Sequence, residues 1–214
     1  MLLSQYQTQV RRLLNDAQKN YWTDGELTDY INDAREQTAV DTLCVRQFQN
    51  GILKAAQEKY EYTDVGLALP QGNQVVDMIN ITIIWGNTRF PLGYAPFTLF
   101  SGMFRQWVGY QRVPVAFTIY NATQFWVAWT PDIDYQAEFD TAIIPLRLAN
   151  DNTVDTIPHR YDQAVKFYAA YQARFKLQQY TEAERMRKEY EMMTARLGAM
   201  PPRRIPYAFE NEVF

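Results

Sequence analysis

The stretch "NYWTDGELTDYINDA" (residues 20–34) carries the signals of a helix start. Thr23 and Glu26 make the T-x-x-E capping box, in which the Thr hydroxyl accepts the N–H of Glu26 and the Glu carboxylate accepts the N–H of Thr23. Acidic residues in the first turn suit the positive end of the helix dipole. Trp22 and Leu27 flank the cap at the positions of a hydrophobic staple. We therefore expect a helix from about residue 24 to the mid-forties, whose start is specified by Trp22, Thr23 and Glu26.

Apolar residues at helical spacing also mark both ends of the chain. In the first segment an apolar stripe recurs every three or four residues, with Arg11, Arg12 and Asp16 off it. Two further stripes lie in the last third of the chain, and the register slip between them predicts a break near residues 179–181. Gly198 is the expected helix stop. The stripes are Leu3, Tyr6, Val10, Leu13 and Ala17; Tyr161, Ala164, Tyr168, Tyr171 and Phe175; and Ala183, Met186, Tyr190, Met193 and Leu197.

The middle of the chain favours strands. Runs rich in β-branched and aromatic residues occupy 74–86, 113–120 and 124–129. The segment "PDIDYQAEFD" (131–140) alternates, which predicts a half-exposed strand. Before residue 60 the pattern is ambiguous, because "LKAAQEKYEY" (53–62) suits either a helix or a hairpin; local propensity favours helix. In 131–140 the apolar face is Ile133, Tyr135, Ala137 and Phe139, and the polar face is Asp134, Gln136, Glu138 and Asp140.

These patterns predict an α+β fold in which N- and C-terminal helices pack together around an inserted antiparallel β domain. We expect N-terminal helices over residues 1–59, the β-rich insertion over 60–150 and C-terminal helices over 151–198. Residues 199–214 contain three prolines and show no periodicity, which predicts an extended C-terminal arm.

Composition narrows the function classes. The single cysteine, Cys44, excludes an intramolecular disulfide and a multi-cysteine zinc site, and the single histidine, His159, cannot supply paired imidazoles to a metal. We interpret Cys44 as a small buried residue and His159 as a surface or capping residue. The start of the chain has neither a basic segment nor a long apolar run, so we expect no secretion signal, no membrane span and folding in a cytoplasm.

Charge gives little indication of nucleic-acid binding. The formal net charge is −3, but between Arg160 and Arg204 basic residues outnumber acidic ones by ten to five. Because those basic residues alternate with Glu along a helix, a solvated helix face explains them better than a phosphate-binding stripe.

Catalytic motifs are missing from the sequence, which has no G-x-G-x-x-G, no G-x-S-x-G and no H-E-x-x-H. The strongest candidate is a row of four carboxylates, which could hydrolyse a glycoside but also fits the water-facing side of a strand. Four aromatic residues could stack on sugars, although core packing or a subunit contact explains them better. We therefore expect no enzyme, no catalytic residue, no metal and no cofactor. The two candidate sets are Asp132, Asp134, Glu138 and Asp140, and Trp107, Tyr110, Trp126 and Trp129.

Four segments in order resemble a known family. They are "VRRLLNDAQKNYWTDGELTDYINDAREQ" (10–37), "IIWGNTRFPLGYAPF" (83–97), "VAWTPDIDYQAEFDTAIIPLRLANDN" (127–152) and "IPHRYDQAVKFYAAYQA" (157–173). Together they resemble the head-to-tail adaptor, or connector, proteins of tailed bacteriophages, over roughly residues 6–195. The chain departs from that pattern at Ala55 and Ala56, where relatives often carry Gly, and beyond Gly198, where no motif matches.

The resemblance implies a structural virion protein. It implies a homo-oligomeric ring, a dodecamer, that binds the portal protein on one face, offers the other to the next neck or tail protein, and extends the DNA channel without binding DNA specifically. It places the protein in the virion neck after assembly in the host cytoplasm, with no membrane partner. The helices are expected to contact the portal and neighbouring copies, and the β domain to face outward or toward the tail.

Two matters stay open at the level of sequence. The alternative function is a carboxylate-dependent cell-wall glycoside hydrolase or a carbohydrate-binding module of a virion. The C-terminal arm is a candidate docking arm, because arms of this kind gain affinity by becoming ordered on a preformed surface. Its candidate residues are Arg203, Arg204, Tyr207, Phe209 and Phe214.

Overall fold

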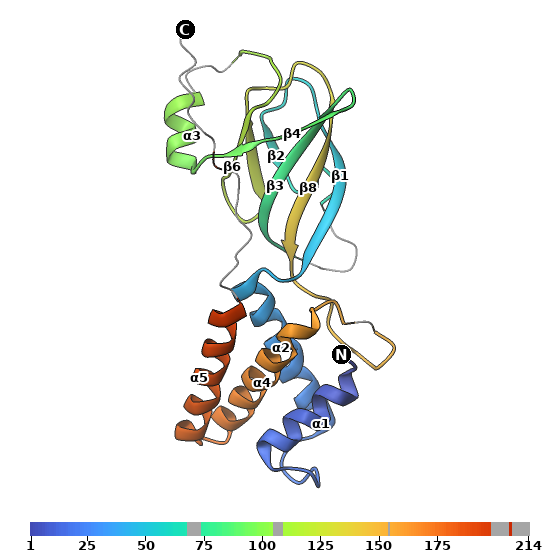
Figure 1. Ribbon diagram of the computed structural model, residues 1–214, viewed down its shortest axis with the longest axis vertical. Coiled ribbons are helices and arrows are strands. Elements are labelled where there is room, and N and C mark those ends of the chain that lie inside the picture. The colour runs from blue at the N-terminus through green and yellow to red at the C-terminus, as the bar shows by residue number, and fades with distance from the viewer. Residues whose placement is uncertain (68–73, 105–108, 154, 198–205, 207–214) are drawn as a thin grey trace. The chain divides into compact units, whose positions relative to one another are not determined.

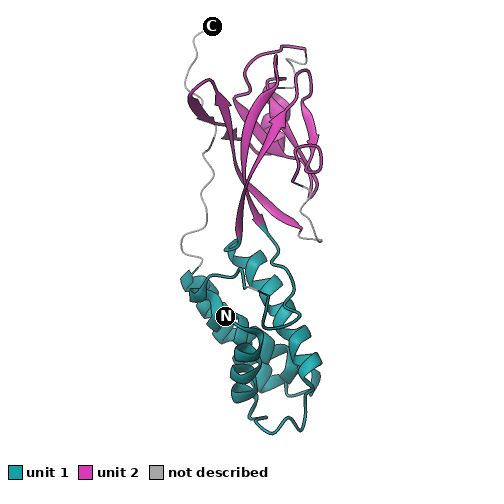
Figure 2. Cartoon of the chain, turned by 90° about the vertical axis from the view of Figure 1, so that its right-hand side faces the viewer, with its two compact units in different colours: residues 1–45, 143–201 teal, residues 46–142, 202–214 magenta. Residues whose placement is uncertain are grey.

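The computed structural model describes residues 1–67, 74–104, 109–153, 155–197 and 206 (Figure 1). The chain divides into two compact units, coloured separately in Figure 2. Unit 1 contains residues 1–45 and 143–201, and unit 2 contains residues 46–142 and 202–214. Unit 1 is helical and is built from the two segments that flank residues 46–142, so this part of unit 2, which contains both sheets, is inserted into unit 1. The α+β fold class is confirmed.

Unit 1 is organised around its fourth helix. Helices α1 (Leu3–Leu14), α2 (Asp24–Thr42) and α5 (Tyr180–Leu197) all contact α4 (Asp162–Lys176), which follows the short 3₁₀ helix η2 (His159–Tyr161). The buried face of α4 is rich in alanine, and small side chains let neighbouring helices approach closely. These alanines are Ala164, Ala169, Ala170 and Ala173, all with no exposed surface.

The helix boundaries follow local sequence closely. Helix α2 begins at Asp24, directly after the predicted cap residue Thr23. Helices α4 and α5 are separated at residues 177–179, next to the predicted break, and Gln178 has a left-handed φ of 59° there. Helix α5 is described as far as Leu197, and the predicted stop at Gly198 lies outside the described residues.

The predicted stripe of α1 needs two corrections. Leu14 is buried, whereas Leu13 is only half-buried and Ala17 is exposed. Arg11 and Asp16, which the stripe leaves on the polar side, are also buried. The reason is that Arg11 Nη1 donates to Asp16 Oδ2 at 2.8 Å, and a paired charge can be buried where an isolated one cannot.

Unit 2 is a β-sandwich of two four-stranded sheets, with helix α3 (Phe97–Phe104) beside it. Sheet 1 has the order β1-β8-β3-β4 and sheet 2 the order β2-β7-β6-β5. The pairs β1–β8, β2–β7, β3–β4 and β6–β7 are antiparallel, whereas β5 pairs with β6 in parallel. The strands are β1 (Arg46–Leu53), β2 (Lys59–Glu61), β3 (Val75–Trp85), β4 (Thr88–Pro91), β5 (Gly93–Tyr94), β6 (Ala116–Ile119), β7 (Gln124–Ala128) and β8 (Tyr135–Ile143).

Both sheets contribute to one apolar core, which is what holds the sandwich together. Phe139 of β8 has no exposed surface and lies edge-on to Phe125 of β7, with ring centroids 5.8 Å apart. The other buried members include Leu53, Tyr60, Met78, Ile81, Ile83, Phe117, Val127, Tyr135 and Ala137.

The favoured helix before residue 60 is wrong. Residues 46–53 form β1, which pairs with β8 from Arg46 opposite Ala142 to Leu53 opposite Tyr135. Gly51 lies in the middle of this strand, where an added Cβ would be 2.4 Å from the carbonyl oxygen of Val65. Glycine in a strand often marks such a close backbone approach. The β-rich unit therefore begins at residue 46 instead of 60 and ends at 142 instead of 150.

The predicted half-exposure of residues 131–140 is only partly correct. The strand itself starts at Tyr135, so Ile133 precedes it and is exposed. Within β8 only Gln136 is exposed, while Glu138 is buried. The physical reason is that β8 is an interior strand of sheet 1, and Arg89 of β4 donates to Glu138 Oε1 at 2.8 Å across its polar face.

Candidate functional site

The capping box at the start of α2 has the expected geometry. Glu26 N–H donates to Thr23 Oγ1 at 3.2 Å, and Thr23 N–H donates to Glu26 Oε2 at 3.1 Å. The second carboxylate oxygen of Glu26 accepts from Lys176 Nζ, at the end of α4, at 2.6 Å. The bonds from Lys176 and Thr23 lower the pKa of Glu26 to about 2. The cap thus joins the first residues of α2 to the last residues of α4.

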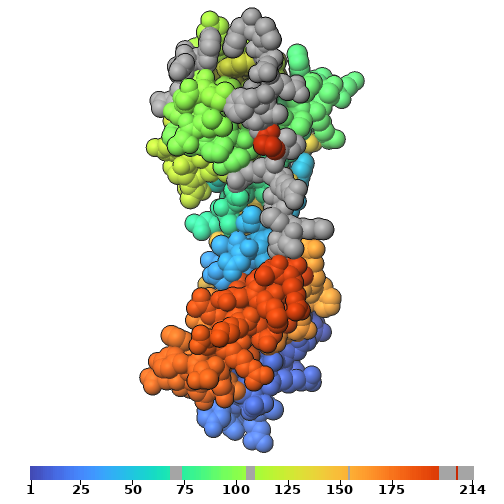
Figure 3. All heavy atoms as spheres, turned by 60° about the vertical axis from the view of Figure 1, so that its left-hand side comes forward, coloured from blue at the N-terminus to red at the C-terminus, as the bar shows by residue number. Residues whose placement is uncertain are grey.

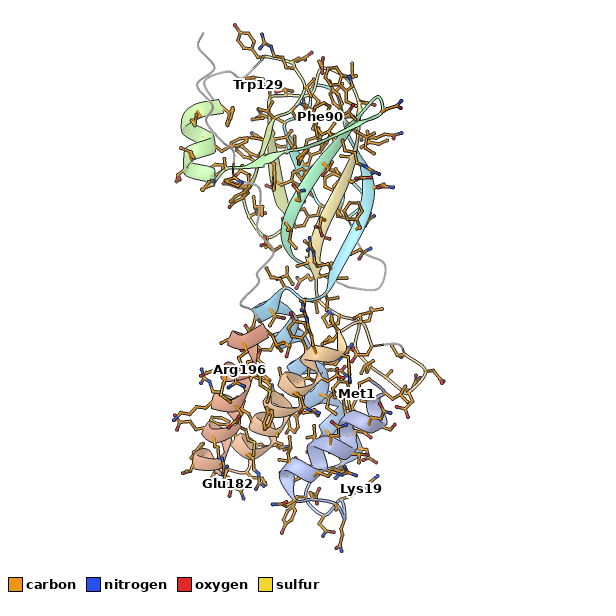
Figure 4. The ribbon with its side chains drawn as sticks, in the orientation of Figure 1. Met1, Lys19, Phe90, Trp129, Glu182 and Arg196 are labelled. Carbon is orange, nitrogen blue, oxygen red and sulfur yellow. The ribbon has the colours of Figure 1, made fainter. Side chains whose placement is uncertain are left out.

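A second contact fixes the loop between α1 and α2. Arg11 Nη2 donates to the carbonyl oxygen of Trp22 at 2.9 Å and to Asp24 Oδ1 at 2.8 Å, in addition to its bond to Asp16. Lys19, labelled in Figure 4, donates to the other Asp24 oxygen at 2.8 Å. Trp22 is buried at the N′ position and Leu27 is buried in the second turn. The residues predicted to specify the helix start therefore lie in a tightly bonded corner.

A further buried polar network centres on Arg35 of α2 and Asp155. Arg35 Nη2 and Nε donate to Asp155 Oδ1 at 2.8 and 3.2 Å, and Arg35 Nη1 donates to the carbonyl oxygen of Leu146 at 2.7 Å. Asn32, one turn earlier, exchanges two hydrogen bonds with the backbone of Leu148. The network therefore binds α2 to the segment that returns from the β unit.

Tyr6 of α1 joins the same network. Its hydroxyl lies 2.8 Å from Asp155 Oδ2 and 2.8 Å from Asp162 Oδ1, and Ile157 N–H donates to Asp155. Burial, reinforced by both carboxylates, raises the pKa of Tyr6 far above its usual value. Burial opposes ionisation of Asp155, but the Arg35 charge and the hydrogen bonds outweigh it and lower the pKa of Asp155. The three segments are thus joined by a carboxylate that stays charged in the interior.

An aromatic row lies along α4 and α5, the helices whose atoms are orange to red in Figure 3. It consists of Tyr190, Tyr168, Tyr171, Phe175 and Tyr180, whose successive ring centroids are 4.9, 5.6, 5.9 and 5.3 Å apart. Phe175 is 53% exposed and Tyr180 is 57% exposed, although aromatic rings of this size are usually covered. Exposed aromatic rings that contact each other are typical of protein interfaces.

A groove borders the aromatic row. Its volume is about 800 Å³, and helices α2, α4 and α5 all line it. Within it, the Tyr190 hydroxyl donates to Asp41 Oδ2 at 2.5 Å, and burial together with that carboxylate raises the pKa of Tyr190. Arg187 Nε donates to Glu191 Oε1 at 2.9 Å on the rim. The lining residues therefore bond to one another and leave a mixed aromatic and polar surface.

The candidate carboxylate row of unit 2 does not form a cluster that faces an open site. Asp132 accepts from the Tyr135 hydroxyl at 2.6 Å, and Asp134 accepts from the N–H of Ala55 at 2.7 Å. Glu138 pairs with Arg89, and Asp140 pairs with Arg46 across the β1–β8 ladder. Each carboxylate thus has a bonding partner within unit 2.

The structure describes three of the four candidate sugar-stacking residues. Trp126 is buried in a small core, where it lies edge-on to Phe97 and stacked on Tyr120. Trp129 has the guanidinium of Arg112 over its ring at 5.4 Å. Tyr110 is exposed, and Trp107 lies outside the described residues. The burial of Trp126 therefore removes one of the three described rings from any shared stacking surface.

The remaining candidates add little chemistry. The proposed docking-arm residues, Arg203, Arg204, Tyr207, Phe209 and Phe214, lie outside the described residues. His159 is exposed and contacts Asp162, while Cys44 is free, half-buried and has its thiol pKa raised by burial. Within the described ranges no group of three or more His, Cys, Asp or Glu side chains is placed to hold a metal ion. No helix there is long and apolar enough to span a membrane.

Sequence reasoning found the cap but missed the network of Tyr6, Arg35 and Asp155. The bond from Arg35 to Asp155 joins residues 120 positions apart, and no local pattern signals such a contact. The available signal was an arginine on the apolar side of α2, one turn after Ile31.

Comparison with known proteins places this architecture in a family. No curated protein matches the chain. The family model described as SU10 adaptor protein matches residues 1–208, which includes all of unit 1 and the whole β-sandwich. Because this match covers nearly the whole chain, the protein belongs to the SU10 adaptor family and is a structural adaptor protein of bacteriophages.

Proposed function

We propose that this adaptor forms a closed ring of identical copies beneath the portal, extends the DNA channel and provides the attachment site for the next neck or tail component. The observation that carries the proposal is the family match over residues 1–208. A dodecamer agrees with the resemblance of the sequence to head-to-tail adaptors. DNA passes through the lumen without specific binding, which suits a net charge of −3, since a strongly basic lumen would retain phosphates.

Unit 1 has the properties that a ring subunit needs. Copies in a ring make heterologous contacts, so one surface of each copy meets a different surface of the next. Such contacts require helices of fixed length and position, which the capping box and the Arg35–Asp155 network provide. The aromatic row of α4 and α5 is the surface that we assign to the neighbouring copy or the portal.

Two alternative functions receive no support from specific contacts. A glycoside hydrolase needs two free carboxylates on either side of a sugar bond, whereas the four candidates are engaged in structural bonds. A carbohydrate-binding module needs exposed stacking rings, whereas Trp126 is packed inside a core. We therefore propose neither.

The test is to mix the purified protein with its cognate portal and image the complex by electron microscopy. We expect a ring on one face of each portal. Replacing Phe175 and Tyr180 together by Ser should lower ring occupancy, because it removes exposed apolar area without touching the core. Tyr21→Ser is the matched control, since Tyr21 is exposed elsewhere in unit 1. Portals that remain bare with the wild-type chain contradict the proposal.

The docking-arm hypothesis has its own test. Deleting residues 199–214 removes every candidate arm residue and leaves every described residue of α5 in place. We expect weaker attachment, measured as the fraction of portals that carry a ring at limiting adaptor concentration. Occupancy equal to that of the full chain rejects the arm but leaves the ring proposal standing.

A further inference from the structure

The edge strands of the two sheets are unequally protected. Sheet 1 has the edges β1 and β4, and sheet 2 has the edges β2 and β5. Strand β2 has three residues and β5 has two, while β4 has four and contains Pro91, which has no N–H to offer. Short length and proline are the usual ways in which proteins prevent an edge from pairing with another chain. Strand β1 has eight residues and no proline, so neither feature protects its edge.

The composition of β1 also favours pairing. The run "QFQNGIL" (47–53) contains neither a proline nor a charged residue. Phe48 is 63% exposed and Ile52 is 50% exposed, and both lie on the outer face because side chains alternate along a strand. The inner face is half-buried, and at Gly51 an added Cβ would lie 2.4 Å from the carbonyl oxygen of Val65. An exposed apolar edge of this length is a template for a further strand.

The backbone groups of β1 alternate in direction. Ile143 N–H donates to the carbonyl oxygen of Val45 at 2.9 Å, which sets the phase of the β1–β8 ladder. In an antiparallel ladder every second residue bonds to the partner strand, so residues 47, 49 and 51 bond to β8. The N–H and C=O groups of Phe48, Asn50 and Ile52 therefore point away from β8. Among the described residues no backbone group bonds to this side of β1.

We infer that this open edge of β1 pairs with β1 of a second copy, antiparallel and centred on Asn50. Only outward-facing residues can pair, which restricts the register to a few choices. The register centred on Asn50 places each Phe48 opposite Ile52 of the partner subunit, so one aromatic–aliphatic pair forms twice. Such cross-strand pairs stabilise sheets. A second copy is the occupant because its β1 has the same length, the same open groups and a complementary order of apolar residues.

The contact is two-fold symmetric, so it is complete with two copies and does not propagate. A ring needs heterologous contacts, and the surface proposed for them is the aromatic row of unit 1. The pairing of β1 is therefore independent of the proposed ring, and each can fail without the other.

Sedimentation velocity of the full chain at increasing concentration tests the inference. We expect a reversible monomer–dimer equilibrium for the wild type. Asn50→Pro removes one outward N–H without removing a bond to β8, and proline is tolerated on an edge strand. We expect it to raise the dimer dissociation constant at least about tenfold, which corresponds to about 1.4 kcal/mol. Asn50→Ala is the matched control, because it keeps the N–H, and should dimerise like the wild type.

A second variant keeps the test decisive if Asn50→Pro fails to fold. Phe48→Lys with Ile52→Lys changes only exposed side chains and should give a monomer with an unchanged circular dichroism spectrum. The inference is overturned if the wild-type chain stays monomeric at all concentrations. It is equally overturned if the wild type associates and the folded variants associate just as strongly.

Discussion

Asp155 is the residue on which the buried contacts of unit 1 converge. It accepts hydrogen bonds from Arg35, Tyr6 and the N–H of Ile157, and its side chain has no exposed surface. A buried carboxylate is tolerated only while its partners remain, because removing one partner leaves an uncompensated charge. The stability of unit 1 therefore depends strongly on single side chains at this point.

Replacing Arg35 by Met tests this dependence. The change leaves Asp155 buried without its cation, so we expect the free energy of unfolding to fall by about 3–5 kcal/mol. Arg147→Met is the control, since Arg147 pairs with Asp33 at 2.8 Å on the surface, where such pairs contribute about 0–1 kcal/mol. Urea unfolding followed by fluorescence measures both. Equal losses in the two variants contradict the assigned role of the network.

Glu26 gives a prediction about pH. Its pKa is lowered from 4.5 to about 2 in the folded chain, so the folded state favours the ionised form. The stabilisation is complete above about pH 4.5 and is lost as the pH falls toward about 2. Glu26→Gln should lower the melting temperature at pH 7, and its difference from the wild type should shrink as the pH falls through this window.

The control for this measurement is Glu36→Gln, which changes an exposed glutamate of the same helix. A difference between wild type and Glu26→Gln that stays constant from pH 7 to pH 2 contradicts the prediction.

At the scale of elements, β1 shows what fixes a strand when local sequence does not. It pairs with β8 over its whole length, and it contains Gly51, where only a residue without a Cβ leaves room for the backbone at Val65. The geometry of this one position thus determines how the segment after β2 packs on the sheet.

Gly51→Ala follows from this geometry. The added methyl carbon would lie 2.4 Å from the oxygen of Val65 and 2.9 Å from Cε2 of Phe139, so the backbone must shift. Overpacking of this kind costs about 1–3 kcal/mol. Gly102→Ala is the matched control, because nothing lies within 4 Å of its added Cβ and alanine favours the helix. Thermal unfolding should show a loss for the first variant and none for the second.

The same elements show which parts of the fold can be predicted from the sequence. Helix α2 and its cap were predictable because their signals lie within a few residues of one another. The identity of β1 was not, because its partner β8 begins more than 80 positions later and strand preference depends on the neighbouring strands. The burial of Arg11 and Arg35 was missed for a similar reason, since a charge is buried only when its partner is known. Family membership could be predicted from four ordered segments. The aromatic row of α4 and α5 and the open edge of β1 could be identified only from the fold.

At the scale of the whole molecule, the chain has two compact units, each with its own core. Separate cores allow separate unfolding, so we expect two transitions in scanning calorimetry. Gly51→Ala should lower the transition of unit 2 alone, and Arg35→Met should lower that of unit 1 alone. A single transition that both variants lower equally contradicts this independence.

The insertion of unit 2 into unit 1 has a consequence for synthesis on the ribosome. Residues 46–142 leave the exit tunnel while helices α1 and α2 still lack α4, α5 and Asp155. Domains generally fold as units during translation, so the sandwich can fold first. Until α4 and α5 are synthesised, the apolar sides of α1 and α2 remain uncovered. For about a hundred codons of translation, the nascent chain thus exposes the apolar sides of α1 and α2, which a chaperone can bind.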